Sequence, residues 1–285
     1  MTRSEIYFFQ PLSQPCRYSY IVGISEQKWK RRKISCQVAR WWGGAIVSGA
    51  VTLAYMNANE RERVVVSVGG SLIVPDGIDT DFLSRFKKLI LEKIDTGLSF
   101  SIIAGGGKVC RRYQDAANTV TPLSHTDLDW IGIHATRLNA QLLRNIFVGH
   151  AHPEVIHNPT VDIHADEPVI IAAGWQPGCS TDYDAVLIAK NLGATRLVNL
   201  SNIDYVYDSD PKKNPEAKKI EKISWADFRK LIPAEWDPGL SSPFDPVAAK
   251  EAEALGLEVA IINGSKLEEF SNYLDNKPFV GTVIS

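Results

Sequence analysis

The stretch Ser101–Tyr113 constrains the fold of this chain more than any other feature of its sequence. An apolar run ends at Ala104 and is followed by three glycines and then by Lys108, Arg111 and Arg112. This order predicts a strand, a tight turn and a helix. Three residues without Cβ let the backbone approach a ligand closely, and the first N–H groups of the helix point at it. The two cations Lys108 and Arg111 favour a phosphate there over an ordinary strand-to-helix turn.

A second glycine turn precedes the first one in the chain. The β-branched run Arg63–Val68 predicts a buried strand, and it ends in Gly69-Gly70-Ser71. Such a turn can also hold an anion on its backbone N–H groups. Two turns of this kind close together indicate a polyphosphate ligand.

The rest of the body alternates strands and helices. Asp79 and Thr80 open a helix that Gly97 stops, and Leu128–Phe147 predicts a second helix. We expect the apolar stripe of that second helix to contain Ile131, Leu138, Leu142 and Ile146. Further strands are expected at 168–173, 196–200, 259–262 and 281–284, with helices at 183–192 and after Asp245-Pro246. The alternation predicts an α/β fold with a mainly parallel sheet covered on both faces.

The first 55 residues differ in composition from the body. They carry eight Lys and Arg against two Glu, which leaves a net charge of about −8 on the remainder and argues against nucleic-acid binding by the body. The uncharged run Trp41–Met56 is shorter than the roughly 20 residues of a membrane span. A weak signal peptide or an interfacial anchor is the alternative. We favour a start assigned too far upstream and treat residues 1–59 as an extension outside the fold, with no membrane partner.

Two further residue groups have competing interpretations. The loop Gly174–Asp182 is rich in turn formers, and Ser180, Thr181 and Asp182 either cap the next helix or serve a site. The histidines His150, His152, His157 and His164 show no metal-ligand spacing, so we expect no protein metal site. Cys16, Cys36, Cys110 and Cys179 form no C-x-x-C pair, which favours a reduced, cytoplasmic setting without disulfides.

The motifs together, from about Arg63 to the C-terminus, resemble the amino-acid-kinase family and, within it, its archaeal-type UMP-phosphorylating members. In chain order they are Gly69-Gly70-Ser71, Gly105–Lys108, Leu128–Ile133 with Thr136–Ala140, Ser180–Asp182, Asn202–Asp204 and Asp208–Lys213. The resemblance implies a three-layer αβα sandwich over residues 60–285, with 60–174 mainly on the UMP side and 175–285 mainly on the ATP side. It also implies transfer of the ATP γ-phosphoryl group to UMP with Mg²⁺, and a cytoplasmic homohexamer.

The resemblance also implies roles for individual residues. The catalytic residues are Asp182, as an organiser of Mg²⁺ or of cationic side chains, with Lys250 and Lys108. The ATP contacts are Gly70, Ser71, Gly107, Arg111, Ser201, Asn202, Tyr207 and Asp210. The UMP contacts are Gly106, Asp129, Trp175, Gln176, Pro177, Gly178, Cys179, Ser180 and Thr181. UMP already carries an anionic phosphate, so the transfer requires no strong general base.

Two departures from the family pattern affect the details. Ser67 stands where bacterial relatives have a phosphate-facing lysine, which the archaeal type also lacks, so Lys108, Arg111 and Lys250 supply the positive charge. Trp175, Gln176 and Cys179 replace the Thr and His residues common in the archaeal loop. A carboxylate or isoprenoid phosphate acceptor, or a ligand-binding relative without catalysis, are the alternatives to a UMP kinase.

Overall fold

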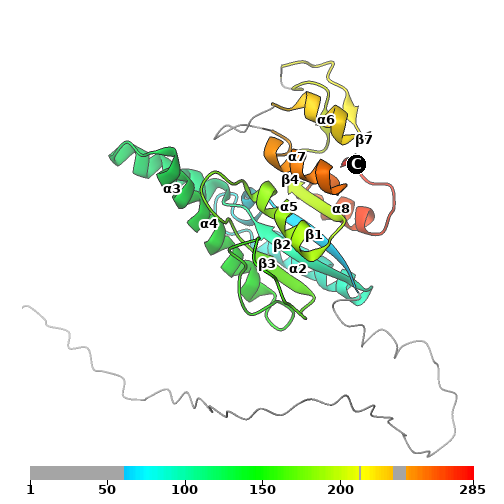
Figure 1. Ribbon diagram of the computed structural model, residues 1–285, viewed down its shortest axis with the longest axis horizontal. Helices are drawn as coiled ribbons and strands as arrows, with labels where there is room; N and C mark the ends of the chain where they lie inside the picture. Colours follow the sequence, from blue (N-terminus) through cyan, green and yellow to red (C-terminus); the bar gives the residue numbers. More distant parts are fainter. Residues whose placement is uncertain (1–60, 212, 234–241) are drawn as a thin grey trace, which may run out of the picture. The chain divides into compact units, whose positions relative to one another are not determined.

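The computed structural model describes residues 61–211, 213–233 and 242–285 (Figure 1). The expectations about residues 1–60 lie outside this part of the chain. The strands are β1 Glu62–Val68, β2 Leu98–Ala104, β3 Val169–Ala172, β4 Arg196–Ser201, β5 Val206–Tyr207, β6 Lys219–Ile220, β7 Lys222–Ile223, β8 Glu258–Asn263 and β9 Thr282–Ile284. The helices are α1 Gly70–Ile73, α2 Thr80–Asp95, α3 Gly107–Val120, α4 His125–Ile146, α5 Thr181–Leu192, α6 Trp225–Leu231, α7 Pro246–Leu255 and α8 Leu267–Leu274.

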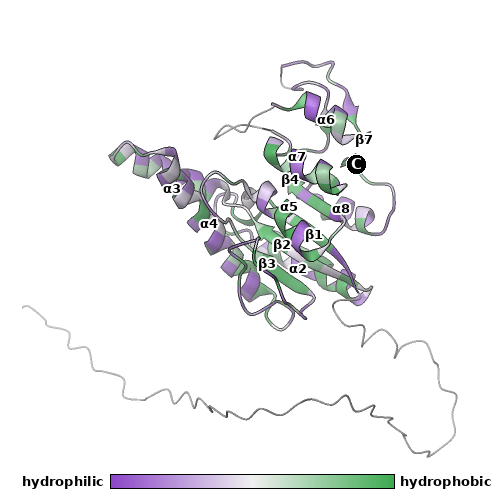
Figure 2. Ribbon diagram, in the orientation of Figure 1, coloured by the Kyte–Doolittle hydropathy of each residue, from purple (hydrophilic) through white to green (hydrophobic). Residues whose placement is uncertain are grey.

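The main sheet has the strand order β3-β2-β1-β4-β8-β9-β7. All neighbouring pairs are parallel except β8 and β9, which are antiparallel. The mainly parallel sheet predicted from the sequence is therefore confirmed. Its strands are the apolar centre of the molecule, whereas hydrophilic residues run along the outer helices (Figure 2).

Side chains of β1 alternate between two separate hydrophobic cores. Val64 and Val66 pack in one core with residues of α2, α4 and α8. Val65 packs in the other with residues of α5, α6 and α7. Because a strand buried on both faces is mostly apolar, the centre of the run, Val64–Val66, shows no polar alternation. The predicted three layers are confirmed.

Helix α4 corrects one prediction about the core. Leu138 was expected on its buried stripe, but its side chain is 67% exposed. The buried face instead carries Thr136 and Asn139 beside Ala140 and Leu143. Apolar periodicity predicted the wrong stripe here, because the buried face also carries polar side chains that bond to neighbouring loops.

The segment between β4 and α7 is more structured than its sequence indicated. The lysine-rich stretch through Lys219 was expected to be a solvated excursion, yet it contributes the hairpin of β5 and β6. It leads into β7 and α6, where Trp225 and Phe228 are buried. These few apolar residues attach an otherwise polar segment to the core.

The two glycine turns pack directly against each other through their backbones. A Cβ atom added to Gly70 would lie 2.5 Å from the carbonyl oxygen of Gly105, and one added to Gly105 would lie 2.7 Å from the nitrogen of Gly70. Gly107 also has a φ of +65°, in the region that favours glycine. Only residues without a Cβ allow the two turns to approach this closely.

We predict that Gly70→Ala lowers the free energy of unfolding by about 3 kcal/mol or more, because the new methyl group meets rigid backbone. Gly77→Ala is the matched control, since nothing lies within 4 Å of a Cβ built there and its φ is not positive. It should change stability by about 0.5 kcal/mol or less. Urea unfolding of both variants measures the difference, and equal stabilities would contradict the packing argument.

Candidate active site

The glycine turns stand at the carboxyl ends of three adjacent parallel strands. The N–H of Gly105 donates to the carbonyl of Val68 at 2.9 Å, and the N–H of Gly69 donates to the carbonyl of Leu200 at 3.0 Å. These bonds tie together the ends of β1, β2 and β4. In open α/β sheets, ligands bind outside the carboxyl ends of the strands. The turns therefore occupy the expected position of a ligand site.

Helix α3 begins at the glycine triplet and directs free N–H groups toward it. Its N-cap is Gly106, and no side chain caps the first turn. The first N–H groups of a 14-residue helix are thus available to an anion, and the helix dipole favours negative charge there. This geometry agrees with the phosphate preference inferred from the sequence.

Cationic side chains surround the opening of these turns. Arg111 donates to the hydroxyl of Ser71 at 3.4 Å, which brings together two of the residues expected to contact ATP. Lys108 forms an ion pair with Asp76 at 3.2 Å, and Arg112 pairs with the same carboxylate at 3.1 Å. Asp76 was not among the expected site residues. Because these pairs are exposed, an incoming phosphate can compete with Asp76 for both cations.

Helix α4 fixes the glycine turn and the loop Gly174–Ser180 in one frame. The side-chain amide of Asn139 donates to the carbonyl of Gly105 at 2.8 Å. On the same helix, the Thr136 hydroxyl accepts from the N–H of Gly174 at 2.8 Å. Asp129 accepts from the N–H of Gly178 at 2.9 Å. The sequence indicated Thr136 and Asn139 only as members of a family motif. Their polar side chains on the buried face of α4 are the signal that could have identified them.

The backbone of Trp175 is held from both sides. Its carbonyl accepts from Arg137 at 3.1 Å, and its N–H donates to Asp184 at 3.1 Å. The Trp175 side chain is partly buried and belongs to neither hydrophobic core of the described residues. The loop therefore presents an indole ring that core packing does not use.

Asp184 is a buried carboxyl group that the sequence reasoning missed. It is 1% exposed, and its second oxygen, Oδ1, is buried without a hydrogen-bond partner. Burial raises its pKa to about 7, and the nearby charge of Asp182 acts in the same direction. Asp184 lies in the first turn of α5, where acidic residues are common because they interact favourably with the helix dipole. Its position in the sequence therefore did not indicate that it is buried.

Asp182 does not cap helix α5. Ser180 is the N-cap, and its hydroxyl accepts from the N–H of Tyr183 at 3.1 Å. Asp182 instead points at the sheet, where it accepts from Ser67 at 3.3 Å and from Asn199 at 3.4 Å. Its other oxygen accepts from the N–H of Asp245 at 3.4 Å. The capping alternative is therefore wrong for this residue, which joins β1, β4 and the start of α7.

The surroundings of Asp182 favour its neutral form. Burial raises its pKa to about 7, and the carboxylate of Asp245 adds to the shift. Asp245 is itself buried and caps α7 by accepting from the N–H of Ala248 at 2.7 Å. A cation or a positively charged group arriving beside Asp182 would lower its pKa again.

Several expected site residues lie farther from these contacts. Ser201 ends β4, and its carbonyl accepts from the N–H of Gly264 at 2.8 Å. Lys250 is exposed on α7, about 7 Å along the helix axis from Asp245. Tyr207 lies in β5, and Asp210 pairs with Lys213 at 3.8 Å. In the described part of the chain, no hydrogen bond or ion pair joins Lys250, Asn202 or Tyr207 to the glycine turns.

The remaining loop residues follow Trp175 on the surface of the site. Gln176 and Gly178 are exposed, whereas Pro177, Cys179 and Thr181 are partly buried. Gly178 has a φ of +81°, which suits its position in the turn held by Asp129. Burial raises the pKa of the Cys179 thiol.

Comparison with known proteins agrees with this geometry. The sequence model of the amino acid kinase family matches residues 62–263. The chain belongs to the amino acid kinase family. It is 39% identical to a uridylate kinase of Thermococcus kodakarensis over 78% of this chain and 99% of that one. A uridylate kinase of Methanosarcina barkeri is 34% identical over 78% and 95% of the two chains.

Solved structures place this amino acid kinase beside the same group. The crystal structure of uridylate kinase from Archaeoglobus fulgidus has a TM-score of 0.67 and 29% identity, covering 78% of this chain and 99% of that one. A UMP kinase from Bacillus anthracis, at 22% identity and a TM-score of 0.64 over 79% and 96% of the chains, shares the fold. The fold and the family expected from the motifs are therefore confirmed.

The raised pKa of Asp182 predicts a pH-dependent stability. Its carboxyl group titrates near 4 when unfolded and at about 7 when folded, so the folded protein binds the proton more tightly. This contribution is complete below pH 4 and is lost as the pH rises to about 7. Asp182→Asn should therefore lose less thermal stability between pH 5 and pH 8 than the parent protein. Melting curves at both pH values test this, and parallel losses would contradict the assignment.

Proposed function

We propose that this amino acid kinase transfers the γ-phosphoryl group of ATP to UMP, forming ADP and UDP. The observation that carries the proposal is that helix α4 holds both the Gly105–Gly107 turn, against which the Gly69–Ser71 turn packs, and the loop Gly174–Ser180. The glycine turns and the start of α3 offer backbone N–H groups to phosphates. The loop Gly174–Ser180 is held by the same helix, α4. The similarity to proteins named uridylate kinase supports UMP as the acceptor.

On the donor side, Gly70, Ser71 and Gly107 bind ATP phosphates in this proposal, with Arg111 and Lys108 stabilising their charge. The pairing of Arg111 with Ser71 supports this, because it already directs a guanidinium across the two turns. Phosphoryl transfer needs positioning and charge stabilisation more than covalent chemistry. Ser201, Asn202, Tyr207 and Asp210 remain proposed contacts for the nucleoside of ATP.

On the acceptor side, Gly106, Asp129 and residues 175–181 hold UMP. Asp129 fixes the loop through Gly178, and Arg137 with Asp184 fix Trp175. These contacts limit the motion of the loop before a ligand arrives, which reduces the entropy lost on binding. No general base is assigned, since the phosphate of UMP is already anionic.

Mg²⁺ enters this proposal together with ATP. The described residues contain no group of three or more His, Cys, Asp or Glu that could hold a metal ion. Kinases commonly bind Mg²⁺ through substrate phosphates and one or two carboxylates. Asp182 is the carboxylate we assign to it or to phosphate-binding cations, and the ion would neutralise charge on the transferred group. Lys250 is proposed to approach the same phosphates from α7.

The assembly and setting of the enzyme are also proposals. Helix α3 has no buried residues, and Tyr113, Val120 and Leu138 on α3 and α4 are exposed apolar side chains. Such a surface supports a homo-oligomer, for which the family resemblance suggests a hexamer. None of the described helices is long and apolar enough to cross a membrane. We propose a cytoplasmic enzyme of pyrimidine nucleotide synthesis.

A coupled ADP-release assay tests the acceptor directly. UMP should give the highest kcat/KM in a panel with CMP, AMP, acetylglutamate and isopentenyl phosphate. Asp182→Asn tests the proposed catalytic carboxylate. Its kcat should fall by about 10²-fold, because the amide cannot supply the negative charge that holds Mg²⁺ or the phosphate-binding cations. A higher kcat/KM for acetylglutamate or isopentenyl phosphate would replace UMP as the acceptor. A variant with near-normal kcat at saturating Mg²⁺ would remove Asp182 from the catalytic residues.

Trp175→Ala should raise the KM for UMP by roughly tenfold, since stacking of a base on an aromatic ring is worth about 1–3 kcal/mol. The KM for ATP, measured in the same preparations, is the internal control and should stay unchanged. Steady-state kinetics with each substrate varied in turn provide both values. An unchanged KM for UMP would assign the indole to contacts between subunits instead.

A further inference from the structure

A second group of cations lies at the opposite end of β1 from the glycine turns. Arg61 and Arg63 are two residues apart, and side chains at this spacing point to the same face of an extended chain. With His164, Asp166 and Leu192 they line a cavity of about 290 Å³, which Ile163 and Ala165 complete. Arg63 and Gly70 are seven residues apart, so the cavity is roughly 20 Å from the proposed phosphate site.

The two arginines of this cavity lack acidic partners. Arg63 donates to the carbonyls of Phe100 at 3.2 Å and Glu167 at 3.4 Å, and to the hydroxyl of Ser101 at 3.4 Å. These acceptors are neutral. The Nε of Arg61 is buried and has no hydrogen-bond partner. Neither arginine forms an ion pair with any residue that the structure describes.

The acidic groups nearby do not compensate this charge. Asp166 lines the cavity but pairs with neither arginine, and the Glu167 side chain is engaged by His152 at 3.0 Å. Buried charges in proteins are normally paired, because removing them from water is costly. Burial lowers the pKa of Arg63 to about 10.

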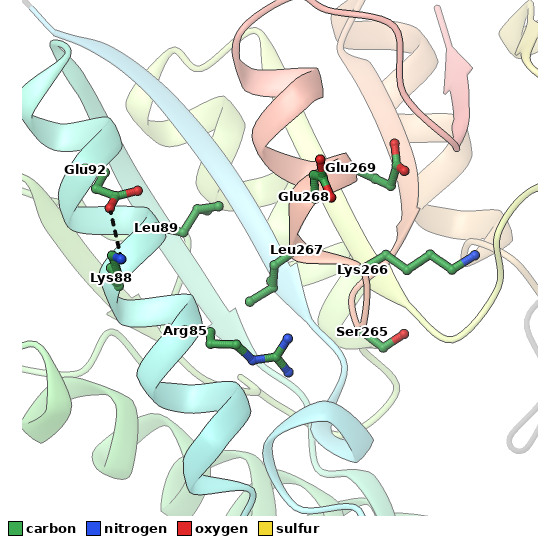
Figure 3. Close-up of a pocket in the computed structure, with 9 residues that line it drawn as sticks. All are labelled: Arg85, Lys88, Leu89, Glu92, Ser265, Lys266, Leu267, Glu268 and Glu269. Carbon is green, nitrogen blue, oxygen red and sulfur yellow. Dashed lines mark ion pairs between the residues drawn. The ribbon is translucent and has the colours of Figure 1, made fainter.

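A second hollow on the molecule is lined by equal numbers of cationic and acidic side chains. It lies between α2 and the start of α8, where Arg85, Lys88 and Lys266 alternate with Glu92, Glu268 and Glu269 (Figure 3). Lys88 and Glu92 form an ion pair at 3.9 Å, and Lys266 pairs with Asp204. Three carboxylates thus line this hollow beside three cations, whereas Asp166 is the one carboxylate that lines the cavity at Arg61 and Arg63.

We propose that the cavity at Arg61 and Arg63 binds a phosphate-type oxyanion, either inorganic phosphate or the phosphate group of a small ester. A guanidinium presents paired N–H donors whose spacing matches two oxygens of a phosphate. The cavity is large enough for a phosphate with a small substituent, and it is separate from the phosphoryl-transfer site.

Helix α5 connects this cavity with the active site. Leu192, its last residue, lines the cavity, while Asp182 in its first turn reaches Ser67 at the other end of β1. An anion at Arg63 therefore binds against the far end of the element that carries the proposed catalytic carboxyl group. The proposal concerns binding and does not rest on the identity of the kinase acceptor.

Arg63→Met tests the proposal, because it keeps an unbranched side chain and removes the charge. Melting of the full-length parent protein should rise by about 3–6 °C at a phosphate concentration ten times the dissociation constant of the cavity. Arg63→Met should lose the part of this rise that the cavity contributes, and Arg61→Met should reduce that part. Arg85→Met is the matched control, since it removes an exposed arginine from the balanced hollow, and it should keep the full rise.

Isothermal titration separates the outcomes and the sources of the phosphate. The parent protein should bind phosphate at one more site per chain than Arg63→Met, whose remaining binding reports the active site. Ribose 5-phosphate binding more tightly than inorganic phosphate at the same site would identify an ester as the ligand, and the reverse would identify the free ion. Equal stoichiometry and equal melting shifts in the parent protein, Arg63→Met and Arg61→Met would overturn the proposal.

Discussion

The backbone contact between the two glycine turns is the constraint on which the site depends. Gly70 and Gly105 approach each other so closely that a side chain on either would collide with main-chain atoms. Hydrogen bonds from Gly69 and Gly105 anchor this contact to β4 and β1. The parallel sheet brings the strand ends together, and the absence of Cβ atoms lets their turns form one continuous anion-binding surface.

Polar groups on buried faces then position the rest of the site around these turns. Thr136 and Asn139 use the inner face of α4 to hold two loops. Asp184 satisfies the backbone of Trp175 from the interior of α5, at the cost of a carboxyl oxygen without a partner. Such groups lower stability and fix geometry, and they concentrate where α4 and α5 meet the strand ends.

Charge is distributed unequally between the two ends of β1. At the carboxyl end, Asp182 is surrounded by Ser67, Asn199 and the acidic Asp245, so its proton is retained to about pH 7 until a cation arrives. At the amino end, Arg61 and Arg63 form no ion pair within the part of the chain that the structure describes. The two proposed sites therefore differ in charge, with carboxyl groups at the carboxyl end of β1 and arginines at its amino end.

Local sequence determined the elements and the family, because glycine triplets, caps such as Asp245 and β-branched runs act through neighbouring residues. Contacts between distant segments decided the rest. No local pattern distinguishes the Asp182 that reaches Ser67 from a helix cap, or shows that Leu138 is exposed while Asn139 is buried. The hydrogen bond from Arg63 to the backbone carbonyl of Glu167 likewise joins residues that are 104 positions apart in the sequence. Which polar side chains are buried, and which groups they bond to, is decided only when the sheet assembles. The tertiary structure therefore determined which polar groups lie together at the candidate site.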